Sequence, residues 1–172
     1  MSEDHRPQTS SEKAKFSAGG RTQFLLLRGK WGLAIDTAVL WLTGYSLMTK
    51  QYALAQRTPY IHTLLLTTTG ARTGLKRTCG LPYWRIGNDY IVRGSNGGGP
   101  TDPHWCHNIR KNPDVRIRAK RKTKHLKAHV STGEERERLF EIMDKKSSST
   151  SMYQNMCAPR ELPLVVLRDA AL

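Results

Sequence analysis

The sequence is poor in acidic residues: it has 14 Asp and Glu against 28 Lys and Arg, a formal net charge of +14 over 172 residues. This balance excludes an acidic disordered regulator and predicts an anionic partner. Nucleic acid, an anionic lipid surface and a phosphorylated or polycarboxylate cofactor would each satisfy it. The hydrophobic content of 38% fits one globular domain and excludes collagen, coiled-coil and multi-span membrane proteins.

Cysteines are scarce as well. Cys79, Cys106 and Cys157 lie far apart and no CxxC motif occurs, so we predict free thiols in a reducing compartment. His104 and His107 have helical spacing but lack a third ligand, so no metal site is predicted. The motifs of serine hydrolases and zinc proteases are also missing, which leaves hydrolytic chemistry without support.

No apolar run follows the first residues, which argues against a secretory signal. We predict a disordered arm over residues 1–23 and an amphipathic helical segment over residues 24–58. The most apolar stretch is residues 31–49, where Ile35, Ala38, Val39 and Leu42 have the spacing of one helix face. A helix packed on the domain is the first interpretation, and an interfacial membrane helix is the alternative. Asp36 argues against a span.

The rest of the chain has the pattern of short strands separated by turns. Strands are predicted over residues 61–69, 78–86, 89–94, 115–119, 125–130 and 162–167, and helices over residues 103–111 and from residue 132. Antiparallel strands with few peripheral helices predict a mainly β or α+β domain of the barrel type.

Local signals suggest how these elements begin and end. Asp102 is expected to cap the helix that starts at Pro103, and Thr132 and Glu135 have the spacing of a capping box. Pro82 lacks an N–H group, so it predicts that the strand at residues 78–86 is an edge or bulged strand.

Residues 70–77 form the first loop that could bind a ligand. Gly70 and Gly74 allow a tight turn, while Arg72, Lys76 and Arg77 place three cations within six residues. Such a loop can hold a phosphate through guanidinium groups and backbone N–H groups. The alternative is an ordinary basic hairpin.

Residues 94–100 form the second loop, with three consecutive glycines from Gly97 to Gly99. Backbone without side chains lets a flat group approach closely. The following helix directs its free N–H groups to this loop, and Trp105 and Asn108 share one of its faces. The alternative is a plain connection with a core tryptophan.

Residues 110–127 contain nine Lys and Arg and a single acid, Asp114. A run of this kind is usually the solvated face of a hairpin. No helix-turn-helix, zinc finger or RNP aromatic pair accompanies it, so we do not expect nucleic acid as a partner.

These loops occur in an order that matches a known family. Residues 64–74, 95–98, 103–109, 112–113 and 160–167 together resemble the deazaflavin-dependent nitroreductase family, also called the F(420)H2-dependent quinone reductase family. The resemblance covers about residues 60–168. It implies that residues 59–172 form a split β-barrel with peripheral helices, which binds coenzyme F(420), a deazaflavin with a phosphate and a polyglutamate tail.

The resemblance also implies an oxidoreductase that passes a hydride from reduced F(420) to a quinone, a nitroaromatic compound or another electron-poor small acceptor. Ser95 and Tyr153 are the expected catalytic donors. The expected cofactor-binding residues are Arg72, Thr73, Gly74, Arg77, Ser95, Asn96, Gly97, Gly98, Trp105 and Asn108. The stretch before the last strand keeps only Tyr153 of the several tyrosines found in nitro-reducing members.

Alternative functions are also compatible with the sequence. The same barrel could bind F(420) without catalysis or use FMN or haem, and a basic module for nucleic acid or a membrane surface is a further alternative. We expect a cytoplasmic protein, with or without membrane association. A peripheral membrane contact through residues 31–49 and a homodimer are both left open.

Overall fold

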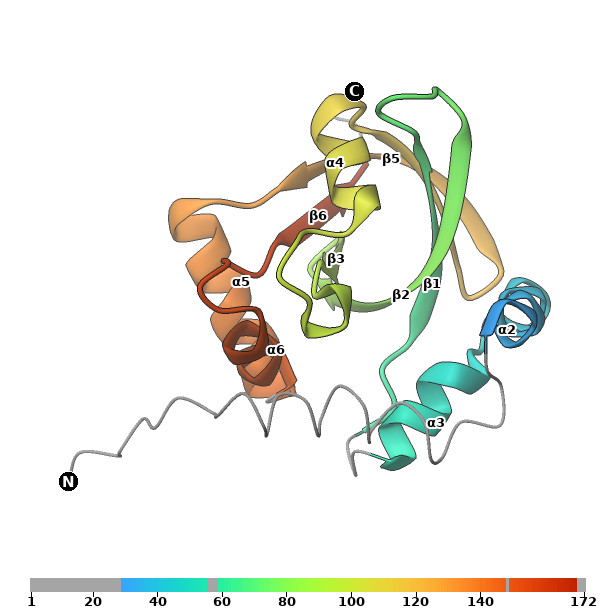
Figure 1. Cartoon of the computed structure of the whole chain (residues 1–172), viewed down its shortest axis with the longest axis horizontal. Helices are drawn as coiled ribbons and strands as arrows, with labels where there is room; N and C mark the ends of the chain where they lie inside the picture. The colour runs from blue at the N-terminus through green and yellow to red at the C-terminus, as the bar shows by residue number, and fades with distance from the viewer. Residues whose placement is uncertain (1–28, 56–58, 148, 170–172) are drawn as a thin grey trace.

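The structure is a computed structural model that describes residues 29–55, 59–147 and 149–169 (Figure 1). The arm predicted over residues 1–23 lies outside the described residues. Six antiparallel strands close into a barrel in the order β1–β2–β3–β6–β5–β4. The strands are β1 (Thr63–Thr69), β2 (Lys76–Ile86), β3 (Asp89–Arg93), β4 (Asp114–Ala119), β5 (Lys122–Val130) and β6 (Leu164–Arg168). The predicted barrel is therefore confirmed.

The barrel interior is filled by side chains that alternate along the strands. Leu64 and Leu66 of β1 and Val115 and Ile117 of β4 point into this core, as the period-2 pattern requires. A second apolar cluster lies outside the barrel, where β3 and β6 meet the helices α5 (Gly133–Lys146) and α6 (Ser149–Cys157). Figure 1 shows α5 and α6 on one side of the barrel and α2 and α3 on the other.

The prediction that Pro82 makes β2 an edge or bulged strand agrees with the pairing of β2. β2 pairs with β1 up to Pro82 and with β3 from Tyr83 onward, so each half of the strand is paired on one side only. Pro82 is the last residue paired with β1, and the next N–H group, that of Tyr83, donates to the carbonyl of His62 at 2.9 Å. The missing N–H of Pro82 falls where one pairing ends and the next begins.

Two helices replace the single one predicted over residues 31–49. They are α2 (Gly29–Thr43) and α3 (Leu47–Ala55), separated at Gly44. Gly44 has φ +78°, a left-handed conformation typical of the residue that ends a helix. The buried carboxylate of Asp36 accepts from the Ser46 hydroxyl at 2.9 Å and the Met48 N–H at 3.0 Å, which fixes the corner. Neither helix, nor any other in the described ranges, could cross a bilayer.

Both predicted capping arrangements are wrong in their chemistry. Helix α4 (His104–Lys111) begins one residue later than predicted, and its N-cap residue is Pro103 rather than Asp102. Helix α5 does have Thr132 at its N-cap, but the Thr132 side chain makes no capping bond. Glu135 instead meets His129 at 2.8 Å and Arg168 at 3.4 Å. Glu135 therefore bonds side chains of β5 and β6 rather than the start of its own helix.

Candidate functional site

The first part of the site is the basic turn, residues 70–77, which joins β1 to β2. Two backbone hydrogen bonds close it: Gly70 N–H to the Leu75 carbonyl at 2.8 Å, and Gly74 N–H to the Gly70 carbonyl at 2.9 Å. Gly74 has φ +68°, a conformation that glycine adopts at little cost. The sequence of the turn therefore suits its shape.

Helix α4 holds the basic turn through one amide side chain. The Asn108 oxygen accepts from the Ala71 N–H at 2.9 Å, and the Asn108 nitrogen donates to the Thr68 hydroxyl at 3.0 Å. Asn112 adds a bond to the Thr69 carbonyl at 3.3 Å. Asn108 is 8% exposed, so these bonds are sheltered from water. Asn108 thus fixes the position of the basic turn relative to helix α4.

The cations of the basic turn face solvent. Arg72, Arg77 and Thr73 are exposed, and neither arginine forms an ion pair with a carboxylate in the described part of the chain. Within the same described residues, Lys76 reaches only the neutral Thr69 hydroxyl, at 2.7 Å. The turn therefore presents uncompensated positive charge, which is the condition for attracting an anionic ligand.

The second part is the glycine loop, residues 94–100, between β3 and α4. Asn96, Gly97 and Gly98 have φ values of +47°, +65° and +83°, so the chain is left-handed for three residues. A Cβ atom at Gly98 would meet the Met156 side chain of α6 and would have to adopt a φ of +83°, so a side chain at this position would be strained. The loop leans against α6 at this point.

Arg160 holds the glycine loop together. Its guanidinium group is largely buried, with 14% of the side chain exposed. It donates to three carbonyl oxygens of the loop, those of Gly94 at 3.2 Å, Ser95 at 3.3 Å and Gly99 at 2.9 Å. It also pairs with Asp102 at 2.9 Å, and Asp102 in turn meets Arg110 at 2.6 Å. One side chain therefore fixes both ends of the loop.

The third part is helix α6, which brings Tyr153 to the loop's side of the barrel. Cys157, one helical turn after Tyr153, touches the Ser95 carbonyl at 3.5 Å. The Tyr153 ring covers the guanidinium of Arg93 at 4.3 Å, and Trp84 lies 5.1 Å from the same group. Burial lowers the pKa of Arg93 to about 10, so it stays charged at neutral pH.

The donors available at the site are hydroxyl groups. Among the described residues, neither the Ser95 nor the Tyr153 hydroxyl has a hydrogen-bond partner in the chain. Burial raises the pKa of Cys106 to about 12 and also raises the pKa of Cys157, so these thiols stay protonated near pH 7. A thiolate nucleophile is therefore not part of this arrangement. All three cysteines are free, as expected.

The predicted residues are distributed over this frame as follows. Arg72, Thr73, Gly74 and Arg77 lie on the basic turn, and Ser95, Asn96, Gly97 and Gly98 lie on the glycine loop. Trp105 is 9% exposed and belongs to the barrel core, so a contact with a ligand stays a prediction for it. Sequence reasoning missed Arg160, Asp102 and Arg93. Their partners lie about 60 residues away, and no local pattern indicates them.

Comparisons with known proteins agree with this frame. The family model for F(420)H2-dependent quinone reductase matches residues 46–169. An F(420)H2-dependent quinone reductase of Mycobacterium tuberculosis H37Rv is 36% identical over 106 residues, which are 60% of this chain and 71% of that protein.

Solved structures are similar as well. An F(420)H2-dependent reductase has a TM-score of 0.56 at 30% identity, covering 62% of this chain and 93% of that one. A structure described as a domain-swapped dimer has a TM-score of 0.57 at 25% identity, covering 78% and 96%. The chain thus belongs to the F(420)H2-dependent quinone reductase family.

Proposed function

We propose that the chain oxidises reduced coenzyme F(420) and reduces a quinone, as an F(420)H2-dependent oxidoreductase. Family membership carries this conclusion and disfavours FMN or haem as the cofactor. Nitroaromatic and other electron-poor compounds are further candidate acceptors. When bound, the deazaflavin supplies the hydride. The chain's own residues must hold the ring and acceptor together and stabilise the charge that develops.

The residues present fit such a cofactor. A phosphate with a polyglutamate tail needs cations that are not already paired with acids, and Arg72 and Arg77 have no acidic partner among the described residues. A flat ring needs backbone that is free of side chains, and Gly97, Gly98 and Gly99 supply it. We infer that the basic turn binds the tail, that the glycine loop faces the ring, and that Asn108 keeps the turn in place.

The hydroxyls of Ser95 and Tyr153 are our candidates for the donors to the acceptor. An oxygen that gains charge during hydride transfer is stabilised by a donor that is already oriented. Neither hydroxyl is used by another group in the described chain, and both are half-buried. Arg93 beneath the Tyr153 ring would keep that ring in position.

Titration with the whole cofactor and with its tail-less chromophore tests this function. We expect the whole cofactor to bind with a dissociation constant below roughly 100 μM and the chromophore to bind more weakly. Arg72→Glu should weaken only the binding of the whole cofactor, whereas Arg138→Glu, an exposed site on α5, should change neither. If neither compound binds, the proposed function is wrong.

A peripheral membrane contact is the second part of the proposal. Among the described residues, seven of the eight large hydrophobic side chains that are exposed lie on α2 and α3, and Trp31 is 84% exposed. An apolar helix face on a protein of charge +14 suits an anionic membrane surface. A homodimer and a cytoplasmic location stay predictions.

Co-sedimentation with phosphatidylglycerol vesicles measures this contact. Replacing Trp31 and Ile35 together with serine should weaken vesicle binding by about tenfold, because each side chain buries apolar area in the interface. The control is Leu75→Ser, since Leu75 is 57% exposed but lies on the basic turn. Equal sedimentation of the double variant and the wild type would refute the contact.

A further inference from the structure

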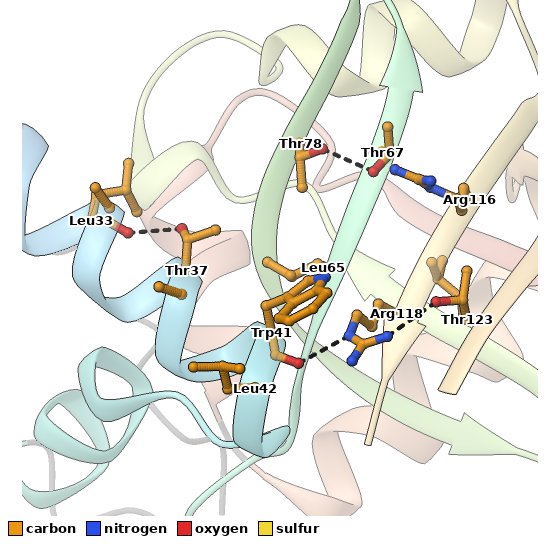
Figure 2. A pocket seen from close by; sticks show the side chains of 13 residues that line it. Leu33, Thr37, Trp41, Leu42, Leu65, Thr67, Thr78, Arg116, Arg118 and Thr123 are labelled. Atoms are coloured by element: carbon orange, nitrogen blue, oxygen red, sulfur yellow. Dashed lines mark hydrogen bonds between the residues drawn. The ribbon is translucent and has the colours of Figure 1, made fainter. Parts of the chain in front are cut away.

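A cavity of about 860 Å³ lies between α2 and the outer surface of the barrel (Figure 2). None of its lining residues belongs to the basic turn or the glycine loop. Trp41 and Leu42 of α2 and Leu65 of β1 are among the apolar residues that line it. The volume is in the range of small-molecule sites, about 300–1,000 Å³.

The cavity exists because α2 touches the rest of the protein through a narrow stripe. Gly32, Asp36 and Leu40, at helical spacing, are its buried residues. The adjacent face carries Leu33 and Trp41, which line the cavity and stay about half exposed, although the Trp41 ring meets Arg118 of β4. The cavity is therefore an open groove between α2 and the barrel, and the side chains of α2 that line it are mainly apolar and unfavourable to hydrate.

Two cations line the barrel side of the groove. Arg116 and Arg118 point outward from β4 on alternate positions, and Figure 2 shows both at the cavity. Arg118 donates to the Trp41 carbonyl at 3.0 Å and the Thr123 hydroxyl at 3.4 Å, and both partners are neutral. In the described part of the chain, neither arginine has a carboxylate partner.

The Arg118 guanidinium also lies over the Trp41 ring, 4.5 Å from its centre. Close to Arg116, the Thr67 and Thr78 hydroxyls form a hydrogen-bonded pair at 2.9 Å (Figure 2). The barrel side of the groove is therefore cationic, with Arg116 next to a polar pair of threonines, while its α2 side is mainly apolar. This distribution matches a molecule with one anionic end and a long apolar body.

We propose that the groove binds a long-chain fatty acid, with its carboxylate at Arg116 and its hydrocarbon chain along α2. A guanidinium group pairs with a carboxylate through two parallel hydrogen bonds, and each buried methylene group contributes about 0.8 kcal/mol. A neutral ligand would cover two cations without compensating them. A second copy of this chain has few carboxylates to offer, with 14 acids against 28 basic residues.

The test uses cis-parinaric acid, a fluorescent fatty acid, with the full chain and without vesicles. We expect saturable binding in the micromolar range, displaced by palmitate and not by hexadecanol, which lacks the carboxylate. Arg116→Gln and Trp41→Ala should each weaken binding about tenfold. The matched controls, Arg138→Gln and Trp31→Ala, should bind like the wild type, because Trp31 lies on the same helix outside the groove.

Three results would overturn the proposal: no saturable binding, displacement by hexadecanol as strong as by palmitate, or equal loss in the control variants. Displacement of the probe by F(420) would overturn it as well, since the groove would then be part of the cofactor site. Unchanged probe binding in Arg72→Glu separates this inference from the proposed function. Arg116 is exposed, so Arg116→Gln should fold normally, which thermal unfolding checks.

Discussion

Replacing Arg160 with alanine should lower both the stability of the protein and its affinity for F(420) more than any other single change near the site. The substitution removes the donor to three loop carbonyls and the buried pair with Asp102. Breaking a buried pair of this kind costs about 3–5 kcal/mol. Urea unfolding measures the stability, and fluorescence titration of the folded protein measures the affinity.

Lysine at position 160 separates the two effects. A lysine keeps the charge next to Asp102, but its compact ammonium group cannot reproduce the planar fork that reaches carbonyls on both sides. We therefore expect Arg160→Lys to regain much of the stability while the KM for reduced F(420) stays raised. Arg168→Ala, which removes a more exposed arginine, is the control. A KM that returns to the wild-type value with lysine would show that Arg160 only stabilises the fold.

The strands could be predicted because the residues of each strand, or of the turn beside it, show a recognisable local pattern. Along β4, Val115 and Ile117 alternate with Arg116 and Arg118, and this alternation alone determines which side faces the core. The turn at Gly87 between β2 and β3 is equally local, and its φ of +58° is the value that glycine there suggests. Period and turn chemistry therefore define the barrel before any long-range contact is known.

Helix α6, the third part of the candidate site, could not be predicted from local sequence patterns. The stretch that forms α6 begins with serine and threonine, which favour turns over helices. Its first turn is held from outside: Arg93 donates to the Ser149 and Thr150 hydroxyls, and the Asp144 carboxylate accepts from the Ser151 N–H at 2.8 Å. A helix that depends on tertiary contacts does not appear in the periodicity of its sequence.

Asp102 is a single side chain whose role could not be predicted from the local sequence either. Its position before Pro103 is that of a good N-cap, yet its carboxylate pairs with Arg160 and Arg110. Charge-assisted bonds to two guanidinium groups outweigh one bond to a backbone N–H. The glycines and the cluster of cations indicated a candidate site in the sequence, but nothing local indicated that Arg160 and Asp102 shape its glycine loop.

Asn108→Leu should weaken the binding of the whole cofactor about tenfold and hardly change the binding of its tail-less chromophore. Leucine has a similar size but leaves the Ala71 N–H and the Thr68 hydroxyl without their partner, which costs about 1–3 kcal/mol. The basic turn carries Arg72 and Arg77, so its displacement affects the charged tail of the ligand first. Isothermal titration with both compounds measures the difference.

Asn108→Asp is the informative companion, because it keeps the acceptor for the Ala71 N–H but loses the donor to Thr68. Its effect should lie between those of the wild type and Asn108→Leu. Asn88→Ala, in the exposed turn between β2 and β3, should bind both compounds normally. A proportional loss for whole cofactor and chromophore in Asn108→Leu would place the tail somewhere other than the basic turn. That outcome would leave the family assignment intact and would require another basic surface, such as residues 120–124, to hold the anion.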